Sequence, residues 1–203
     1  MSFEPLQERL VSRNVALLLL GWIFIASGIG LAGWFKSVSA PFVAATVWTL
    51  TALVLLACWK VPSFKSWASN VDLRWLVLPH VTRFVAGLCL FSFCSRGELP
   101  FAFAAPAGWG DIIVAVLAVL LLALSGARNW KMLLFWNTIG FADILFVVMT
   151  ALRLGLADWQ SMHALREFPL SLLPTFLVPL IIASHILIFI RALRTGRPPN
   201  QLE

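Results

Sequence analysis

The sequence predicts an all-α integral membrane protein in which six transmembrane helices form one bundle. Of its 203 residues, 61% are hydrophobic and 12% are charged, whereas a soluble domain has about 45–50% apolar and about 25% charged residues. Long apolar runs confirm the membrane class, and the length of the chain allows six spans. The net charge of +6 comes without a basic run of five or more residues, which disfavours nucleic-acid binding.

The runs predict a single transmembrane domain covering residues 1–203. The expected spans are about 15–35, 41–59, 75–94, 109–124, 132–154 and 169–190. The first run is too long for the 7–15-residue apolar core of a signal peptide, so we expect it to be retained. Before the last span, the segment DWQSMHALREF places Trp159, Met162 and Leu165 at helical spacing. This pattern predicts a short amphipathic helix lying in the membrane interface.

The distribution of Lys and Arg predicts the orientation. Ten of them lie in the N-terminal segment, in the loops between spans 2 and 3 and spans 4 and 5, and in the C-terminal tail. Four lie on the opposite side: Lys36, Arg96, Arg153 and Arg166. Because cytoplasmic loops are enriched in Lys and Arg, both termini are expected in the cytoplasm.

Five polar side chains are predicted inside the membrane, and they form the candidate buried site. Counting about 1.5 Å per helical residue from the span ends puts His80, Asn137 and His185 at one level toward the cytoplasm. The same count puts Arg83 and Asp143 together near the middle of the membrane. Ionisable groups at this depth mark functional sites by default.

Arg83 and Asp143 are predicted to contact each other. A lone Arg or Asp at the centre of a membrane helix costs about 2.5–3.5 kcal/mol on insertion scales, and facing opposite charges reduce that cost. Two interpretations stay open. The pair, with His80 and Asn137, could serve only to lock spans 3 and 5 together, or it could carry function.

A second candidate site is predicted at the outer face. Its members are the charged residues around the loop before span 4 and the segment before span 6, namely Arg96, Glu98, Asp111, Arg166 and Glu167. Paired carboxylates serve acid–base chemistry or metal binding. Ordinary interfacial charge explains them equally, and Asp111 could simply cap span 4. No catalytic motif identifies a nucleophile or base.

His80 and His185, on different spans at similar depth, also allow axial ligation of a b-type haem. The alternative is a hydrogen-bonded pair of bundle histidines. Cys58, Cys89 and Cys94 lie in or beside apolar runs without a C-x-x-C spacing, so they predict neither a disulfide framework nor a zinc site.

Backbone signals mark two other places. Gly28, Gly30 and Gly33 match G-x-G-x-x-G, but no strand precedes them. They predict close helix packing through the pairs Ala26/Gly30 and Gly28/Ala32. Pro179 lies inside span 6 and frees the carbonyl of Thr175. Because lipid offers no partner for that carbonyl, the kink is expected to face protein or water.

The leading functional prediction is movement of a small solute, ion or proton along a polar path among spans 3–6. The alternatives are a membrane-embedded enzyme or haem redox protein, and a non-catalytic membrane subunit. Expected partners are the lipid bilayer and a small solute or ion. Association with further copies of the chain stays open, and nucleic acid is not expected. The expected location is the bacterial inner membrane.

Overall fold

The structure, a computed structural model, describes residues 4–124 and 129–195, and the side chains of 10–124 and 129–194. Every regular element in these residues is helical, and six segments are long and apolar enough to cross a membrane. They are Leu10–Leu31, Ala40–Lys60, Leu73–Ser95, Phe101–Ala123, Trp130–Ala157 and Leu173–Arg194. The prediction of an all-helical chain with six candidate spans is confirmed. The side chains of Arg9, Arg128 and Arg197, which entered the charge count, lie outside the described residues.

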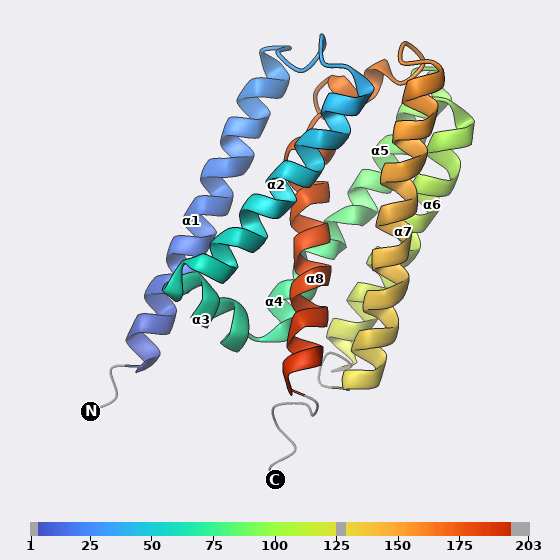
Figure 1. Cartoon of the computed structure of the whole chain (residues 1–203). Coiled ribbons are helices and arrows are strands. Elements are labelled where there is room, and N and C mark those ends of the chain that lie inside the picture. Colours follow the sequence, from blue (N-terminus) through green and yellow to red (C-terminus); the bar gives the residue numbers. More distant parts are fainter. Residues whose placement is uncertain (1–3, 125–128, 196–203) are drawn as a thin grey trace.

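Two of the spans are composite (Figure 1). The third joins a short α-helix to a 3₁₀ segment and a longer α-helix, and the sixth begins with one π-helical turn. The elements are α1 Glu4–Leu31, α2 Ala40–Lys60, α3 Pro62–Asn70, α4 Leu73–Val77, η1 Leu78–Thr82, α5 Arg83–Ser95, α6 Phe101–Ala123, α7 Trp130–Ala157, η3 His163–Arg166, η4 Leu173–Leu177 and α8 Val178–Thr195.

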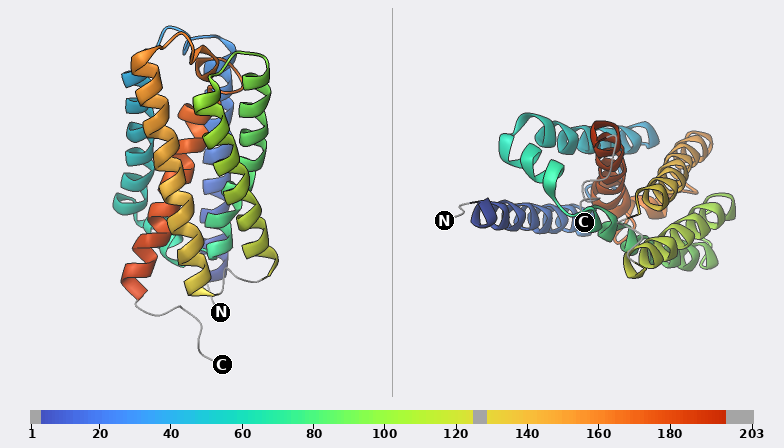
Figure 2. Two further views of the ribbon diagram at one scale, coloured as in Figure 1. Left: turned by 90° about the vertical axis from the view of Figure 1, so that its right-hand side faces the viewer. Right: turned by 90° about the horizontal axis from the view of Figure 1, so that it is seen from below.

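The bundle has a buried centre and an exposed edge. In the most apolar stretch of the last span, 56% of the residues are buried. The corresponding share is 11% in the spans of α1 and α2. Seen from below, α8 lies among the other helices and α1 lies at the periphery (Figure 2). Helices α5 and α6 approach closely because Gly87 presents no side chain to α6. A Cβ at Gly87 would come within 2.6 Å of the Gly108 carbonyl oxygen.

The fourth span begins earlier than its composition indicated. The stretch PFAFAAPAG was interpreted as a loop because of its Pro and Gly content, yet α6 begins at Phe101. Pro100 occupies the N-cap, where a missing N–H removes no intrahelical bond, while Pro106 lies inside the helix and removes the bond to the Ala102 carbonyl. Asp111 therefore lies about 15 Å along the helix, at 1.5 Å per residue, and not at its start.

The carbonyl freed by Pro179 finds its partner in α1. Trp22 Nε1 donates to the Thr175 oxygen at 2.8 Å, which agrees with the expectation that the kink faces protein or water. Gly30 packs against Phe168 and Ser171, and Ala26 is buried. The second small-residue pair, Gly28/Ala32, is exposed, so its predicted packing role is wrong.

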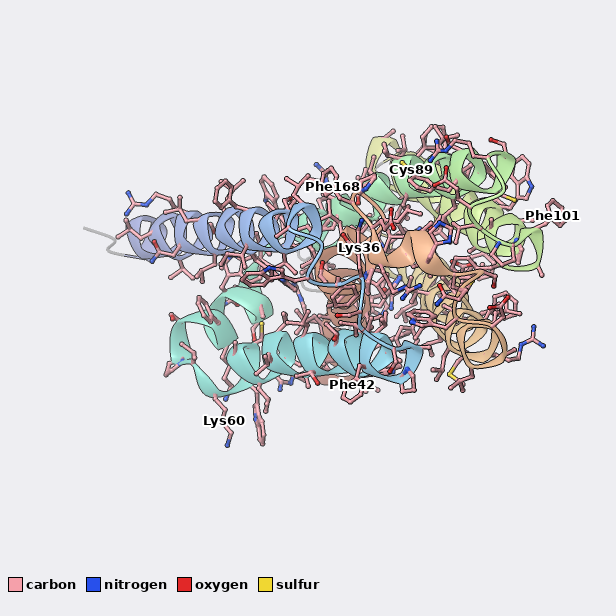
Figure 3. All side chains as sticks on the ribbon, turned by 90° about the horizontal axis from the view of Figure 1, so that it is seen from above. Lys36, Phe42, Lys60, Cys89, Phe101 and Phe168 are labelled. Atoms are coloured by element: carbon pink, nitrogen blue, oxygen red, sulfur yellow. The ribbon has the colours of Figure 1, made fainter. Side chains whose placement is uncertain are left out.

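The expected interfacial helix after Asp158 is replaced by a cap of turns, residues 158–172. Its one helical piece is the four-residue η3, because the Asp158 side chain accepts from Gln160 N and Ser161 N and starts a turn. Trp159 Nε1 donates to Val38 O at 2.9 Å. Figure 3 shows Lys36 and Phe168 where the α1–α2 loop and this cap meet.

Gly87→Ala tests the close α5–α6 contact. Overpacking against a backbone oxygen should lower the free energy of unfolding by about 1–3 kcal/mol. Gly28→Ala is the matched control because no atom lies within 4 Å of its added Cβ, and helix propensity favours Ala there. Thermal unfolding of the two purified variants measures the difference. Equal stability would contradict the packing.

Candidate functional site

Arg83 is completely buried between two carboxylates from two other helices. Its Nε donates to Asp111 Oδ1 at 2.6 Å, and its Nη2 donates to Asp143 Oδ2. Its Nη1 contacts the Gly140 carbonyl oxygen at 3.4 Å. The relative exposure of the side chain is 0% for Arg83, 8% for Asp111 and 16% for Asp143. Arg83, Asp111 and Asp143 are called the charge cluster below.

The predicted contact between Arg83 and Asp143 is confirmed, and Asp111 joins it. Because α6 begins at Phe101, Asp111 lies deep enough to reach Arg83 Nε, while Asp143 accepts from the neighbouring Nη2. Gly110 leaves the necessary space, since a Cβ there would overlap the Asp143 carboxylate. The guanidinium therefore ties α5, α6 and α7 together.

The histidines form a second layer next to the charge cluster. His80 precedes Arg83 by three residues through the 3₁₀ segment η1, a geometry that stacks side chains at i and i+3. Asn137 Nδ2 donates to the His185 carbonyl oxygen at 3.2 Å, and His185 Nδ1 donates to Asn137 Oδ1 at 2.8 Å. His80 Nε2 lies 2.8 Å from Ser184 Oγ. His80, Asn137, Ser184 and His185 are called the histidine layer.

Hydrogen bonding assigns the proton on each ring. The Ser184 hydroxyl donates to Ile181 O, so its oxygen accepts from His80 Nε2–H. His185 carries its proton on Nδ1, facing Asn137. The other two ring nitrogens, His80 Nδ1 and His185 Nε2, are buried without a partner among the described residues. In neutral rings both nitrogens are lone-pair acceptors.

Gly140 connects the two levels. Its carbonyl oxygen faces Arg83 Nη1 at 3.4 Å, and a Cβ there would lie 3.1 Å from His185 Nε2. Any larger residue at position 140 would push the histidine away from the charge cluster. Sequence reasoning missed Gly140, Gly110 and Ser184. The two glycines had a visible signal, because Gly110 directly precedes Asp111 and Gly140 lies about one turn before Asp143.

The predicted outer-face site does not assemble as one group. Arg96 pairs locally with Glu98, and Lys36 lies 3.7 Å from Glu167. Arg166 is buried and donates to Lys36 O at 2.7 Å, fixing the cap to the α1–α2 loop. Asp111 belongs to the charge cluster. The outer prediction is corrected accordingly, because each of these charges is satisfied by its own neighbours.

A cavity of about 70 Å³ reaches the charge cluster from the side of the cap. Its walls are apolar residues of α2, α6, α7 and the start of span 6, with Trp159 and Leu165 from the cap among them. Arg83 and Asp111 supply its charged lining, while His80 and His185 do not line it. The space suits a small solute with an apolar body and one polar group, or several waters.

The histidine pair does not fit axial ligation of a haem. The ring centroids of His80 and His185 are 4.3 Å apart and tilted by 57°, so the rings contact each other directly. A bis-histidine haem needs the porphyrin plane between the two imidazoles. Trp136 also packs edge-on against His80, with centroids 4.8 Å apart. The haem alternative is therefore set aside.

The charge balance of the cluster predicts that losing one carboxylate destabilises the protein much less than losing both carboxylates or the guanidinium. Asp111→Asn or Asp143→Asn alone leaves Arg83 with one carboxylate, so we expect a loss below about 1 kcal/mol. Arg83→Gln, or both Asp→Asn changes together, leaves buried charge unpaired and should cost about 3–5 kcal/mol. Thermal unfolding of the purified variants measures these losses.

Arg96→Gln is the control for removing an arginine, since exposed pairs contribute about 0–1 kcal/mol. Additive effects of the two Asp→Asn changes would contradict the shared role of Arg83.

No curated protein and no solved structure matches the chain. A family model described as a domain of unknown function (DUF8737) matches residues 40–193. The matched stretch runs from α2 into α8 and contains the whole charge cluster and histidine layer, while α1 lies outside it. Since this match covers well over half of the sequence, the chain belongs to the DUF8737 family.

Proposed function

We propose that this membrane protein moves a small anionic solute together with a proton, using the charge cluster as the shared binding site. The observation that carries the proposal is the charge count: one guanidinium faces two carboxylates in a place without exposure for Arg83. With all three groups ionised the cluster carries one negative charge, which is costly at membrane depth. One bound proton cancels it.

The same charge count gives the ratio of protons to solute anions. A solute carboxylate competes with Asp111 or Asp143 for the Arg83 guanidinium, whose planar fork suits carboxylates. The displaced aspartate then loses its counter-ion and takes up a proton. The loaded cluster contains Arg83, the solute anion and two protonated aspartates, and it is neutral. One anion therefore enters with one proton, and the step transfers no net charge.

The histidine layer provides the route for the proton to the other side. His80 Nδ1 and His185 Nε2 are proton acceptors without a partner among the described residues, and Gly140 lies between His185 and Arg83. The cavity supplies the route for the solute. It reaches Arg83 and Asp111 from the cap, and its apolar walls select a solute with an apolar body.

A membrane-embedded enzyme is the second candidate. It is favoured by one observation: the cavity includes Arg83 and Asp111 but neither histidine, so the described conformation has access to the cluster from one side. A transporter needs a second conformation that opens the cluster toward the histidine layer. An enzyme needs only the one-sided cavity.

The proposed orientation puts both termini in the cytoplasm of a bacterial inner membrane. Basic residues gather at the end of the bundle where α1 begins and α8 ends (Figure 1), and they include Lys60, Lys65, Lys131 and Arg194. The enrichment of cytoplasmic loops in Lys and Arg supports this orientation. A C-terminal reporter active only in the cytoplasm should be active, and the same reporter inserted after Glu98 should be inactive. The reverse pattern would invert the topology.

Proton coupling is tested in liposomes that contain the purified protein, with radiolabelled short-chain aliphatic monocarboxylates as the probes. An inward gradient of about one pH unit should support up to about tenfold accumulation, since 1.4 kcal/mol corresponds to a factor of ten. Asp143→Asn keeps Asp111, which still takes up a proton when the solute displaces it, so this variant should still accumulate the solute. The double variant Asp111→Asn/Asp143→Asn has no carboxylate to protonate, so it should retain solute exchange and lose gradient-driven accumulation.

Glu98→Gln is the matched control outside the cluster and should accumulate the probe like the wild type. Uptake equal to that of protein-free liposomes would contradict transport of this solute class. Equal accumulation by the double variant Asp111→Asn/Asp143→Asn and the wild type would contradict proton coupling at the cluster.

A further inference from the structure

A second site lies at the end of the bundle where α2 ends. A groove of about 340 Å³ runs between α2, α3 and α8, and the same end of these helices is visible in Figure 1. It shares no residue with the charge cluster, the histidine layer or the cavity under the cap. It is therefore a candidate binding site independent of the proposed transport.

Three cationic side chains line the groove: Lys65 from α3, and Arg191 and Arg194 from α8. Lys65 and Arg194 are exposed and have no ion-pair partner within the described part of the chain. Arg191 donates to the Val71 carbonyl oxygen and interacts with Asp72, so it also fixes α8 to the α3–α4 connection. The rim of the groove thus carries concentrated positive charge.

The wall of the groove is apolar. Leu55 and Leu56 from α2 face Leu187 and Ile190 from α8 across it. Trp59 lies where this apolar wall meets the basic rim, the position that amphipathic indoles take at membrane interfaces. A ligand that fills the whole groove needs an anionic head and a hydrocarbon tail.

We propose that this groove binds a phospholipid with an anionic headgroup. The headgroup phosphate lies against Lys65 and Arg194, with the Ser69 hydroxyl beside them, and an acyl chain lies along the leucines of α2 and α8. Basic pockets between transmembrane helices recognise anionic headgroups in this way. A soluble phosphate would use the rim alone and leave the apolar wall without a ligand.

Native mass spectrometry of the purified protein tests the proposal with three probes: phosphatidylglycerol, phosphatidylcholine of the same chain length, and inorganic phosphate. Phosphatidylglycerol should bind at least tenfold more tightly than the other two. Equal binding of phosphatidylcholine would overturn the role of the cations. Binding of inorganic phosphate as tight as that of phosphatidylglycerol would assign the site to a soluble anion and overturn the lipid proposal.

Variants locate the site. Lys65→Gln and Arg194→Gln should each weaken phosphatidylglycerol binding about fivefold, which corresponds to about 1 kcal/mol per cation. Lys131→Gln is the matched control, because it removes one exposed positive charge outside the groove. An unchanged unfolding midpoint without added lipid shows that a variant is folded. Equal weakening in Lys131→Gln would overturn the site, as would full binding in the double variant.

Discussion

The structure depends on one interaction, the pairing of the Arg83 guanidinium with carboxylates from two neighbouring helices. An arginine at this depth is tolerated only if its charge is compensated and its donors are bonded. Asp111, Asp143 and the Gly140 carbonyl supply those partners. Because each comes from α6 or α7, satisfying the guanidinium also fixes the relative position of α5, α6 and α7.

The surrounding backbone is adapted to this requirement. Gly87 lets α5 approach α6, Gly110 makes room for the Asp143 carboxylate, and Gly140 makes room for His185. The 3₁₀ segment η1 aligns His80 with Arg83 on one face. Small residues and local departures from α-helical geometry are thus concentrated where polar side chains must meet. Along α1, by contrast, most side chains face outward, and its contact with Thr175 satisfies one carbonyl of the sixth span.

Much of this arrangement followed from the sequence. Apolar run length fixed the number of candidate spans, and the cost of burying charge was enough to pair Arg83 with Asp143. Asp111 was assigned to the wrong face because the Pro- and Gly-rich stretch before it was interpreted as a loop. Pro100 is compatible with a helix start and Pro106 is accommodated inside α6 despite the hydrogen bond it removes, so composition could not locate the start of the helix. The cap after Asp158 was missed for a related reason: apolar residues at helical spacing also suit a turn-rich segment anchored by Trp159 and Arg166.

The central claim is that the charge cluster binds one proton in its resting state. Infrared spectroscopy of the purified protein in lipid at neutral pH measures this directly through the carbonyl stretch of a protonated carboxyl group. The account predicts such a band in the wild type, its loss in Asp111→Asn and in Asp143→Asn, and its retention in Glu98→Gln. A wild-type spectrum without a protonated carboxyl, or a band that survives in both aspartate variants, would contradict it.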